Sequence, residues 1–408
     1  MIVKPFCAYR PPTDLAADVC GPPYDVLNSK EARVLAEGNP KSILHVNKPE
    51  IDLDADVNIY DDEFIAEGYL VKDDSPSFYV YSQQEGEQIQ YGLCVLTSVH
   101  EYESGKIKIH ENTRQAKEDD RTRMVNVQNA NVGPVFLTYN PKSEIDEIIA
   151  DTIQKEPVAD CPGPDNSHHK VWVINDEEIV TRLQDLFNEV DAFYVADGHH
   201  RAKSAYRVGK ERYEAAVAAG ETVTGEEPFN FFLSVVFPSN QLKIVDYNRV
   251  LKDMNGLDDG EFFMKMMPLV HVTGESEEPI RPSKLHEFSV HWNGIWMKME
   301  FKEEVLENLP ANDPVAHLDA QILSEHILGP IFGIDDLRTS DRIDFVGGIR
   351  GLGELKKRCD DDCVLAFALH PVSVDELMAV ADAGMLMPPK STWFTPKLAS
   401  GLVIRLIE

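Results

Sequence analysis

Apolar and polar residues recur along this chain with two different periods, one typical of helices and one typical of strands. Residues 177–190 (EEIVTRLQDLFNEV) place apolar side chains three and four positions apart, which predicts an amphipathic helix. Residues 77–99 hold two β-favouring runs on either side of a Glu-Gly turn, a pattern typical of a hairpin. A further helix is expected over residues 29–37, with Asn28 or Ser29 as its N-cap. Because the two kinds of element interleave over the whole length, the sequence predicts an α+β (mixed α/β) fold.

The middle of the chain carries several more predicted elements, each assigned from its period and its flanking turn residues. They are a helix with acids in its first turn at residues 118–130, a buried strand at 132–139, a loop at 161–169, a strand at 191–196, a helix that opens at His199 or His200, and a hairpin of strands at 230–251.

The length of 408 residues exceeds what one ordinary hydrophobic core supports, so more than one domain is expected. We predict three parts. Residues 1–104 form an N-terminal α+β segment with the hairpin, residues 105–255 form a phosphate-binding core, and residues 256–408 form a C-terminal α+β domain.

The charge of the chain narrows the choice of partners. With 39 basic and 70 acidic side chains the net charge is −31, which repels nucleic acid and anionic membrane surfaces. No segment reaches the roughly 18 uninterrupted apolar residues of a membrane helix. The six cysteines form no Cys-x-x-Cys pair, and the N-terminal residues do not resemble a secretory signal, so a cytoplasmic location is expected. Any anion site in this chain must gather its cations locally.

The strongest chemical motif is DAFYVADGHHRAKSAYR, where a predicted strand runs into Asp197-Gly198 and then into a helix. Gly198 allows a tight turn, and the free amide groups of the helix start would attract an anion such as phosphate. His200 and the forked guanidinium of Arg201 would add donors for the phosphate oxygens. Asp197 would hold Mg²⁺ or accept a proton, and His199 is a further candidate catalytic residue. The alternative is an ordinary Asp-Gly turn before a capped helix.

A second motif, IKIHENTRQAKEDDRTRMV, joins a predicted strand to a predicted helix. His110 and Glu111 follow the strand and are candidate catalytic residues, with Glu111 the competing general base. Arg121, in the helix, is a candidate phosphate ligand. The alternative is a solvated loop followed by a capped helix.

Two proline-stiffened loops complete the set of candidates. The segment MPPKSTWFTPK presents Lys390, Ser391, Thr392 and, later, Lys397, and two lysines with two hydroxyl groups suit phosphate binding. It lacks the glycine pattern of a P-loop. Near the start, the loop GPPYDVL presents Tyr24 and Asp25, which we assign as substrate contacts against the alternative of a structural turn.

Several of these motifs resemble known families. The segment DGHHRAKSA resembles the second signature box of the ParB/sulfiredoxin-like superfamily, in which a strand leads into a turn and helix that hold nucleotide phosphates. The order of parts is also similar: a polar box from His110 to Arg114, a helix, Gly133-Pro134, strands, and then DGHHR. The whole chain resembles the domain-of-unknown-function family 1015 through KPFCAYRP, GPPYDVL, HENT, DDR, YVADGHHRAKSA and MPPKSTWFTPKLASGL. The resemblance implies a ParB/sulfiredoxin-like core with an N-terminal β-rich addition and a C-terminal α+β addition.

The superfamily contains segregation proteins that bind CTP, reductases of sulfinic acids and kinases of free serine. The reductase branch has a cysteine where this chain has His199, and the DNA-binding branch does not suit so acidic a chain. The serine-kinase-like branch enters the box as Asp-Gly-His, which this chain retains. The resemblance therefore implies phosphoryl transfer between ATP or ADP, with Mg²⁺, and a small hydroxyl compound such as free serine, or phosphoserine in reverse. The alternatives are a nucleotide-sensing regulatory module without turnover and a metal-dependent phosphohydrolase.

Overall fold

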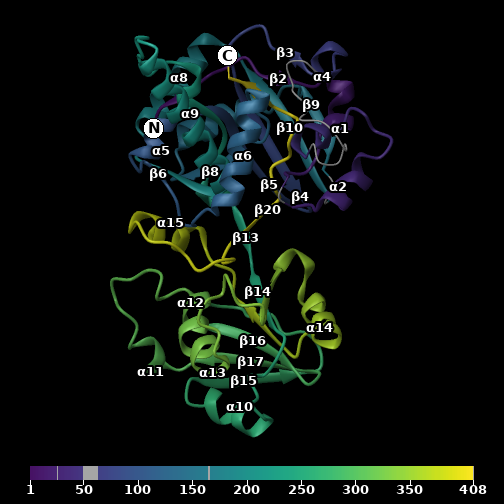
Figure 1. Ribbon diagram of the computed structural model, residues 1–408, viewed down its shortest axis with the longest axis vertical. Coiled ribbons are helices and arrows are strands. Elements are labelled where there is room, and N and C mark those ends of the chain that lie inside the picture. Colours follow the sequence, from purple (N-terminus) through teal and green to yellow (C-terminus); the bar gives the residue numbers. More distant parts are fainter. Residues whose placement is uncertain (25, 49–62, 164–165, 408) are drawn as a thin grey trace. The chain divides into compact units, whose positions relative to one another are not determined.

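The computed structural model describes residues 1–24, 26–48, 63–163 and 166–407, which form two compact units. Unit 1 consists of Met1–Leu242 together with Pro396–Glu408, and unit 2 consists of Lys243–Thr395. Unit 2 is therefore an insertion into the chain of unit 1, and the last segment of the chain returns to unit 1 (Figure 1). The predicted boundary after residue 104 lies inside unit 1, because strands from both sides of it share one sheet. The predicted boundary after residue 255 lies inside unit 2.

Unit 1 is built on a nine-stranded mixed sheet with the order β6-β11-β8-β12-β5-β4-β10-β9, in which β1 also pairs with β5. Two parallel pairs, β6 with β11 and β8 with β12, interrupt otherwise antiparallel pairing. The strands are β1 (Val3–Lys4), β4 (Phe78–Glu85), β5 (Gln88–Ser98), β6 (Ile107–Lys108), β8 (Val135–Tyr139), β9 (Ala159–Pro162), β10 (Ser167–Ile174), β11 (Phe193–Asp197) and β12 (Phe231–Pro238). Two small pairs join β2 (Tyr9–Arg10) to β3 (Val71–Lys72) and β7 (Ala130–Asn131) to β21 (Arg405–Leu406).

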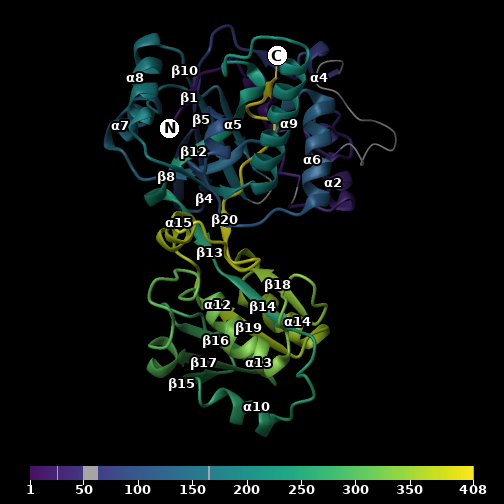
Figure 2. The same ribbon diagram turned by 60° about the vertical axis from the view of Figure 1, so that its left-hand side comes forward.

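One face of this sheet forms the main core of unit 1 with the apolar sides of α7, α8 and α9. The rings of Tyr139, Phe187 and Phe193 meet there at centroid distances of 5.4–6.1 Å. Helices α6 and α9 pack against each other, as both ribbon views show (Figures 1 and 2). The helices of unit 1 are α1 (Ala16–Val19), α2 (Ser29–Ala36), α3 (Leu44–Asn47), α4 (Glu63–Ala66), α5 (Val99–Glu103), α6 (Gln115–Gln128), α7 (Ser143–Thr152), α8 (Glu177–Asn188) and α9 (His199–Ala218).

The C-terminal segment covers part of the opposite face of the sheet. The backbone N–H of Ala399 donates to the Tyr81 hydroxyl at 3.0 Å, and the Gln83 amide donates to the Pro396 carbonyl at 3.2 Å. Farther along, the buried guanidinium of Arg405 donates to the carbonyl of Phe231 at 2.7 Å. These bonds fix residues 396–407 to unit 1, since buried polar groups are costly to leave without partners.

Unit 2 is built on a six-stranded sheet in which every pairing is antiparallel, in the order β15-β17-β16-β19-β14-β18. Along the chain, unit 2 begins with β13 and ends with β20. These two strands form a separate antiparallel pair, with Lys243 opposite Thr395. The elements of unit 2 are β13 (Lys243–Val245), β14 (Tyr247–Leu251), α10 (Asp259–Met266), β15 (Val270–Ser276), β16 (Glu287–Trp292), β17 (Ile295–Phe301), α11 (Glu303–Leu306), α12 (Asp319–Leu323), α13 (Gly329–Phe332), β18 (Ile343–Gly347), α14 (Leu352–Asp361), β19 (Leu365–Leu369), α15 (Val374–Asp382) and β20 (Trp393–Thr395).

The structure confirms the mixed α+β class and many of the predicted elements. The hairpin of residues 77–99 is β4 and β5, with Glu85 opposite Gln88. The helix predicted at 177–190 is α8, and α2 begins after a capping box made by Asn28 and Glu31. None of the helices in the described part of the chain combines the length and the hydropathy needed to cross a membrane.

Three predicted elements differ from the structure. Residues 230–251 do not form a hairpin: β12 pairs with β5 and β8 as a buried central strand, whereas β14 belongs to the sheet of unit 2. The predicted loop at 161–169 contains the end of β9 and the start of β10. Its polar residues fit a buried strand because the His169 ring hydrogen-bonds Tyr81 at 2.8 Å and Ser167 at 2.8 Å. Helix α6 begins at Gln115, three residues before the predicted start.

Candidate functional site

The predicted strand–turn–helix motif is present at one edge of the sheet of unit 1. Strand β11 ends at Asp197, Gly198 forms the turn, and α9 begins at His199. The neighbouring strand β6 is parallel to β11, so both strands end on the same side. His110 and Glu111 follow β6 and therefore lie beside the start of α9. Ligand sites in open sheets commonly lie at the carboxyl ends of parallel strands.

Gly198 is required by the geometry of this turn. Its φ of +90° and ψ of +32° lie in the left-handed region, which favours glycine. A β-carbon at this position would also lie 2.9 Å from Nε of Arg201 and 3.0 Å from its Cζ. The guanidinium of Arg201 therefore folds back over the turn and covers the start of α9 on that side.

Asp197 is held between two cations. Its carboxylate accepts a bond from Arg201 Nη2 at 2.9 Å and one from Lys397 Nζ at 3.1 Å. The side chains of Arg201, Lys397 and Asp197 are 9%, 15% and 23% exposed. Burial favours the protonated acid, but the charges of Lys397 and Arg201 outweigh it and hold the pKa of Asp197 well below its usual range. Arg201 also donates to the carbonyl of Pro134.

This pairing bears on the roles predicted for Asp197. A carboxylate with so low a pKa is a weak proton acceptor, and both of its oxygens already contact cations. The geometry therefore favours Asp197 as the counter-charge that positions Arg201 and Lys397 rather than as a magnesium ligand or a base.

His110, Glu111 and His199 form a second group beside this pair. One ligand atom from each residue lies within 4.8 Å of the others, and the two imidazole rings meet edge to face at a centroid distance of 4.5 Å. Burial lowers the pKa of His110 to about 4 and that of His199 well below its usual value. Both rings are therefore neutral at pH 7, which leaves each with a lone pair that can bind a metal.

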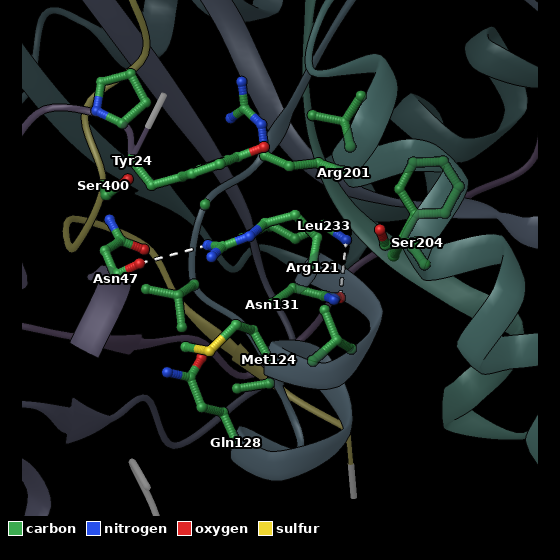
Figure 3. A pocket seen from close by; sticks show the side chains of 18 residues that line it. Tyr24, Asn47, Arg121, Met124, Gln128, Asn131, Arg201, Ser204, Leu233 and Ser400 are labelled. Atoms are coloured by element: carbon green, nitrogen blue, oxygen red, sulfur yellow. Dashed lines mark hydrogen bonds between the residues drawn. The ribbon is translucent and has the colours of Figure 1, made fainter. Parts of the chain in front are cut away.

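A small cavity of about 50 Å³ lies between α6, α9 and the strands of unit 1. Arg121 and Arg201 line it from α6 and α9 (Figure 3). The Cζ atom of Arg121 lies 4.0 Å from the centroid of the Tyr24 ring. Among the described lining residues these two arginines are the charged ones, and each is paired with a carboxylate: Arg121 with Asp120 at 2.6 Å and Arg201 with Asp197 at 2.9 Å. Three residues predicted from separate motifs thus line one cavity. Its polar lining includes four side chains that were not predicted as site residues, namely Asn47, Asn131, Ser204 and Ser400.

The remaining predicted residues lie elsewhere or have other partners. His200 Nε2 accepts a hydrogen bond from the backbone N–H of Arg114 at 3.1 Å. Lys390, Ser391 and Thr392 belong to unit 2, where Lys390 lies over the ring of Tyr247 and Ser391 donates to the Pro388 carbonyl at 2.8 Å. Asp25 lies outside the described residues.

Lys397 is separated from the other candidates of its motif. It belongs to the segment that presents Lys390, but it lies seven residues farther along, in the part of the chain that returns to unit 1. The motif predicts Lys397 as a phosphate ligand together with Lys390. The sequence does not predict its contact with Asp197, which only the tertiary structure brings about.

Comparison with known proteins gives one family and several solved structures. The family model described as "Protein of unknown function (DUF1015)" matches residues 3–321. A search of curated protein sequences finds no match. A conserved hypothetical protein from Pyrococcus furiosus is 14% identical with a TM-score of 0.36, over 77% of this chain and 95% of that one.

Two further structures have similar values. SbnI with a C-terminal truncation, from Staphylococcus aureus, is 12% identical with a TM-score of 0.37, over 77% of this chain and 87% of that one. A free serine kinase in complex with AMP is 13% identical with a TM-score of 0.36, over 76% of this chain and 92% of that one. Similarities this low assign no activity to the chain.

Proposed function

This chain belongs to the DUF1015 family of proteins of unknown function, and from its candidate site we propose that it is a nucleotide-dependent phosphotransferase acting on a small hydroxyl compound. The observation that carries the proposal is the meeting of three distant segments at the start of α9. The end of β6 supplies His110 and Glu111, the turn after β11 supplies Asp197 and Arg201, and the C-terminal segment supplies Lys397.

The arrangement suits a phosphate group for electrostatic reasons. Arg201 and Lys397 are cations held within 3.1 Å of one carboxylate, and the first amide groups of α9 lie beside them. A phosphate can replace Asp197 as the partner of these cations, because it offers oxygen acceptors of the same sign. Arg121 and Arg201 also line the neighbouring cavity, where a phosphate would compete with Asp120 and Asp197 for these two guanidinium groups. A cavity of about 50 Å³ is too small for a whole nucleotide, so it would hold only one chemical group of the bound nucleotide or acceptor.

The proposed chemistry depends mainly on positioning and charge. Phosphoryl transfer has a transition state that spreads negative charge over the phosphate oxygens, and fixed cations stabilise it. Arg201 and Lys397 would supply that charge, and ATP or ADP would bring Mg²⁺ with its phosphates. Free serine as the acceptor, or phosphoserine in reverse, follows from the resemblance of the DGHHR segment to the serine-kinase-like branch.

The test is to incubate the purified protein with Mg²⁺, serine and either ATP or ADP and to follow phosphoserine by ³¹P NMR. Lys397→Met should reduce product formation at least about 100-fold, the scale of losing one charged group that contacts the transition state. Lys106→Met is the matched control, because Lys106 is 60% exposed and pairs with Glu101. Saturable nucleotide binding without product would instead indicate the sensing module.

The metal-dependent phosphohydrolase is a second candidate, and the grouping of His110, Glu111 and His199 favours it. Release of inorganic phosphate from a phosphomonoester, without any nucleotide and dependent on added metal, would support this candidate over the first.

A further inference from the structure

We propose that His110, Glu111 and His199 form a binding site for a divalent transition-metal ion of the Zn²⁺ type. The proposal goes beyond phosphoryl transfer and does not depend on it, because it concerns an ion held by side chains rather than one carried by a nucleotide. The site lies at the edge of the sheet of unit 1 and takes ligands from two segments that are distant in the sequence. His110 and Glu111 follow β6, and His199 is the first residue of α9.

The spacing of the three ligand atoms is close to that of a metal site. They lie within 4.8 Å of one another. In a tetrahedral zinc site with bonds of about 2.0–2.1 Å, ligand atoms are about 3.4 Å apart. The ligand atoms would therefore have to approach one another by at most about 1.4 Å (4.8 minus 3.4 Å), which changes of side-chain torsion provide.

The surroundings of His199 point to a ligand. Its side chain is 6% exposed, and its Nε2 atom has no hydrogen-bond partner among the described residues. A buried polar atom without a partner destabilises the folded protein, so such atoms usually have a reason to be present. A metal ion would use the lone pair of this imidazole directly.

His110 is held in position from outside the group. Its ring hydrogen-bonds to the backbone of Val195 in β11, and the residue is 2% exposed. Histidine ligands commonly bond a backbone group through one nitrogen and the metal through the other, which fixes the orientation of the ring. The contact with β11 also ties His110 to the strand that leads to His199.

The donor set selects the class of metal. Two imidazole nitrogens and one carboxylate oxygen suit Zn²⁺ and similar transition ions, whereas Mg²⁺ and Ca²⁺ prefer oxygen ligands. Three protein ligands leave a fourth position open. Arg201 and Lys397 lie beside the group through Asp197, so an anion bound at the open position would also be near these cations.

The test is a metal titration without nucleotide. Protein stripped with a chelator is titrated with Co²⁺, and the visible absorption of bound Co²⁺ and the metal content after dialysis are measured. We expect one ion per chain, displaced by Zn²⁺ but not by Mg²⁺. Glu111→Gln and His199→Ala should each weaken Co²⁺ binding at least about tenfold. His168→Ala is the matched control, since His168 lies on β10 and pairs with Asp160.

Each outcome decides the proposal. Binding that is absent, or that Glu111→Gln leaves unchanged, would overturn it and leave His110 and His199 as a packed pair of imidazoles. Glu111 is less buried than the two histidines, so Glu111→Gln tests the site even if His199→Ala does not fold; circular dichroism reports folding for both. Because no nucleotide is present, failure of this experiment is separate from failure of the phosphotransfer assay.

Discussion

Asp197 provides the sharpest test of how the site is built. In Asp197→Ala the cations of Arg201 and Lys397 lose the carboxylate that now contacts them at 2.9 and 3.1 Å. At an effective dielectric constant near 20, each contact corresponds to about 5 kcal/mol of Coulomb attraction before desolvation is counted. Removing one member of a buried pair costs about 3–5 kcal/mol in measured cases. Since Asp197 is 23% exposed, we expect a loss of about 3 kcal/mol in the free energy of unfolding of unit 1.

Phosphate should restore much of this loss. If Arg201 and Lys397 form a phosphate site, an anion binds them more tightly when the competing carboxylate is gone. Phosphate at 100 times its dissociation constant stabilises a folded protein by about 2.7 kcal/mol. We therefore expect inorganic phosphate to stabilise Asp197→Ala by about 2–3 kcal/mol and the unchanged protein by clearly less.

Hydrogen exchange measured by mass spectrometry on peptides of α9 is the suitable assay, because two compact units need not unfold in one transition. Asp119→Ala is the control. Asp119 pairs with Arg207 of α9 at 2.7 Å, and the two side chains are 54% and 27% exposed, so this change should destabilise α9 clearly less than Asp197→Ala and show no rescue by phosphate. Equal stability of Asp197→Ala and the unchanged protein, or equal stabilisation of both by phosphate, would refute the reasoning.

Three other predictions concern the turn, the core and unit 2. Gly198→Ala should lower the free energy of unfolding by about 1–2 kcal/mol, because residue 198 has a positive φ that alanine disfavours; unfolding experiments measure this loss. The new β-carbon should also displace Arg201 and so weaken phosphate binding, which a phosphate titration measures. Phe187→Ala should cost about 3–5 kcal/mol in urea unfolding of unit 1, because the fully buried ring packs between two other aromatic rings. The hydrogen bond to Asp319 raises the pKa of His286, so it stabilises unit 2 at low pH and loses this effect as pH rises through the folded-state pKa. Stability of His286→Gln should therefore fall below that of the unchanged protein near pH 5.5 and approach it near pH 8.5; a constant difference would contradict this.

Local patterns along the chain are sufficient to predict several of the longer elements of unit 1. The hairpin β4–β5 and helices α2 and α8 follow from period and capping residues, which act within a few positions. The pairing of β12 could not be predicted in the same way. Its partners β5 and β8 lie about 100 residues away or more, and only packing of the whole sheet selects them.

The same contrast holds for the site. Asp197, Gly198 and Arg201 are close in sequence and were found from one motif, but the sequence did not show that Arg201 folds back onto Asp197. Lys397 reaches Asp197 only because the chain returns from unit 2. The ParB/sulfiredoxin-like core and the serine substrate stay predictions from resemblance.

The insertion of unit 2 has a consequence for biosynthesis. A ribosome must complete all of residues 243–395 before it makes the lysine that completes the pair of cations on Asp197. A nascent chain therefore cannot acquire the proposed activity until Lys397 has emerged, and a product terminated before Lys397 would be inert even with most of the sheet of unit 1 assembled. The antiparallel pairing of Lys243 with Thr395 also brings the two ends of the inserted unit together, so a short linker could replace that unit and show whether the remaining polypeptide folds alone.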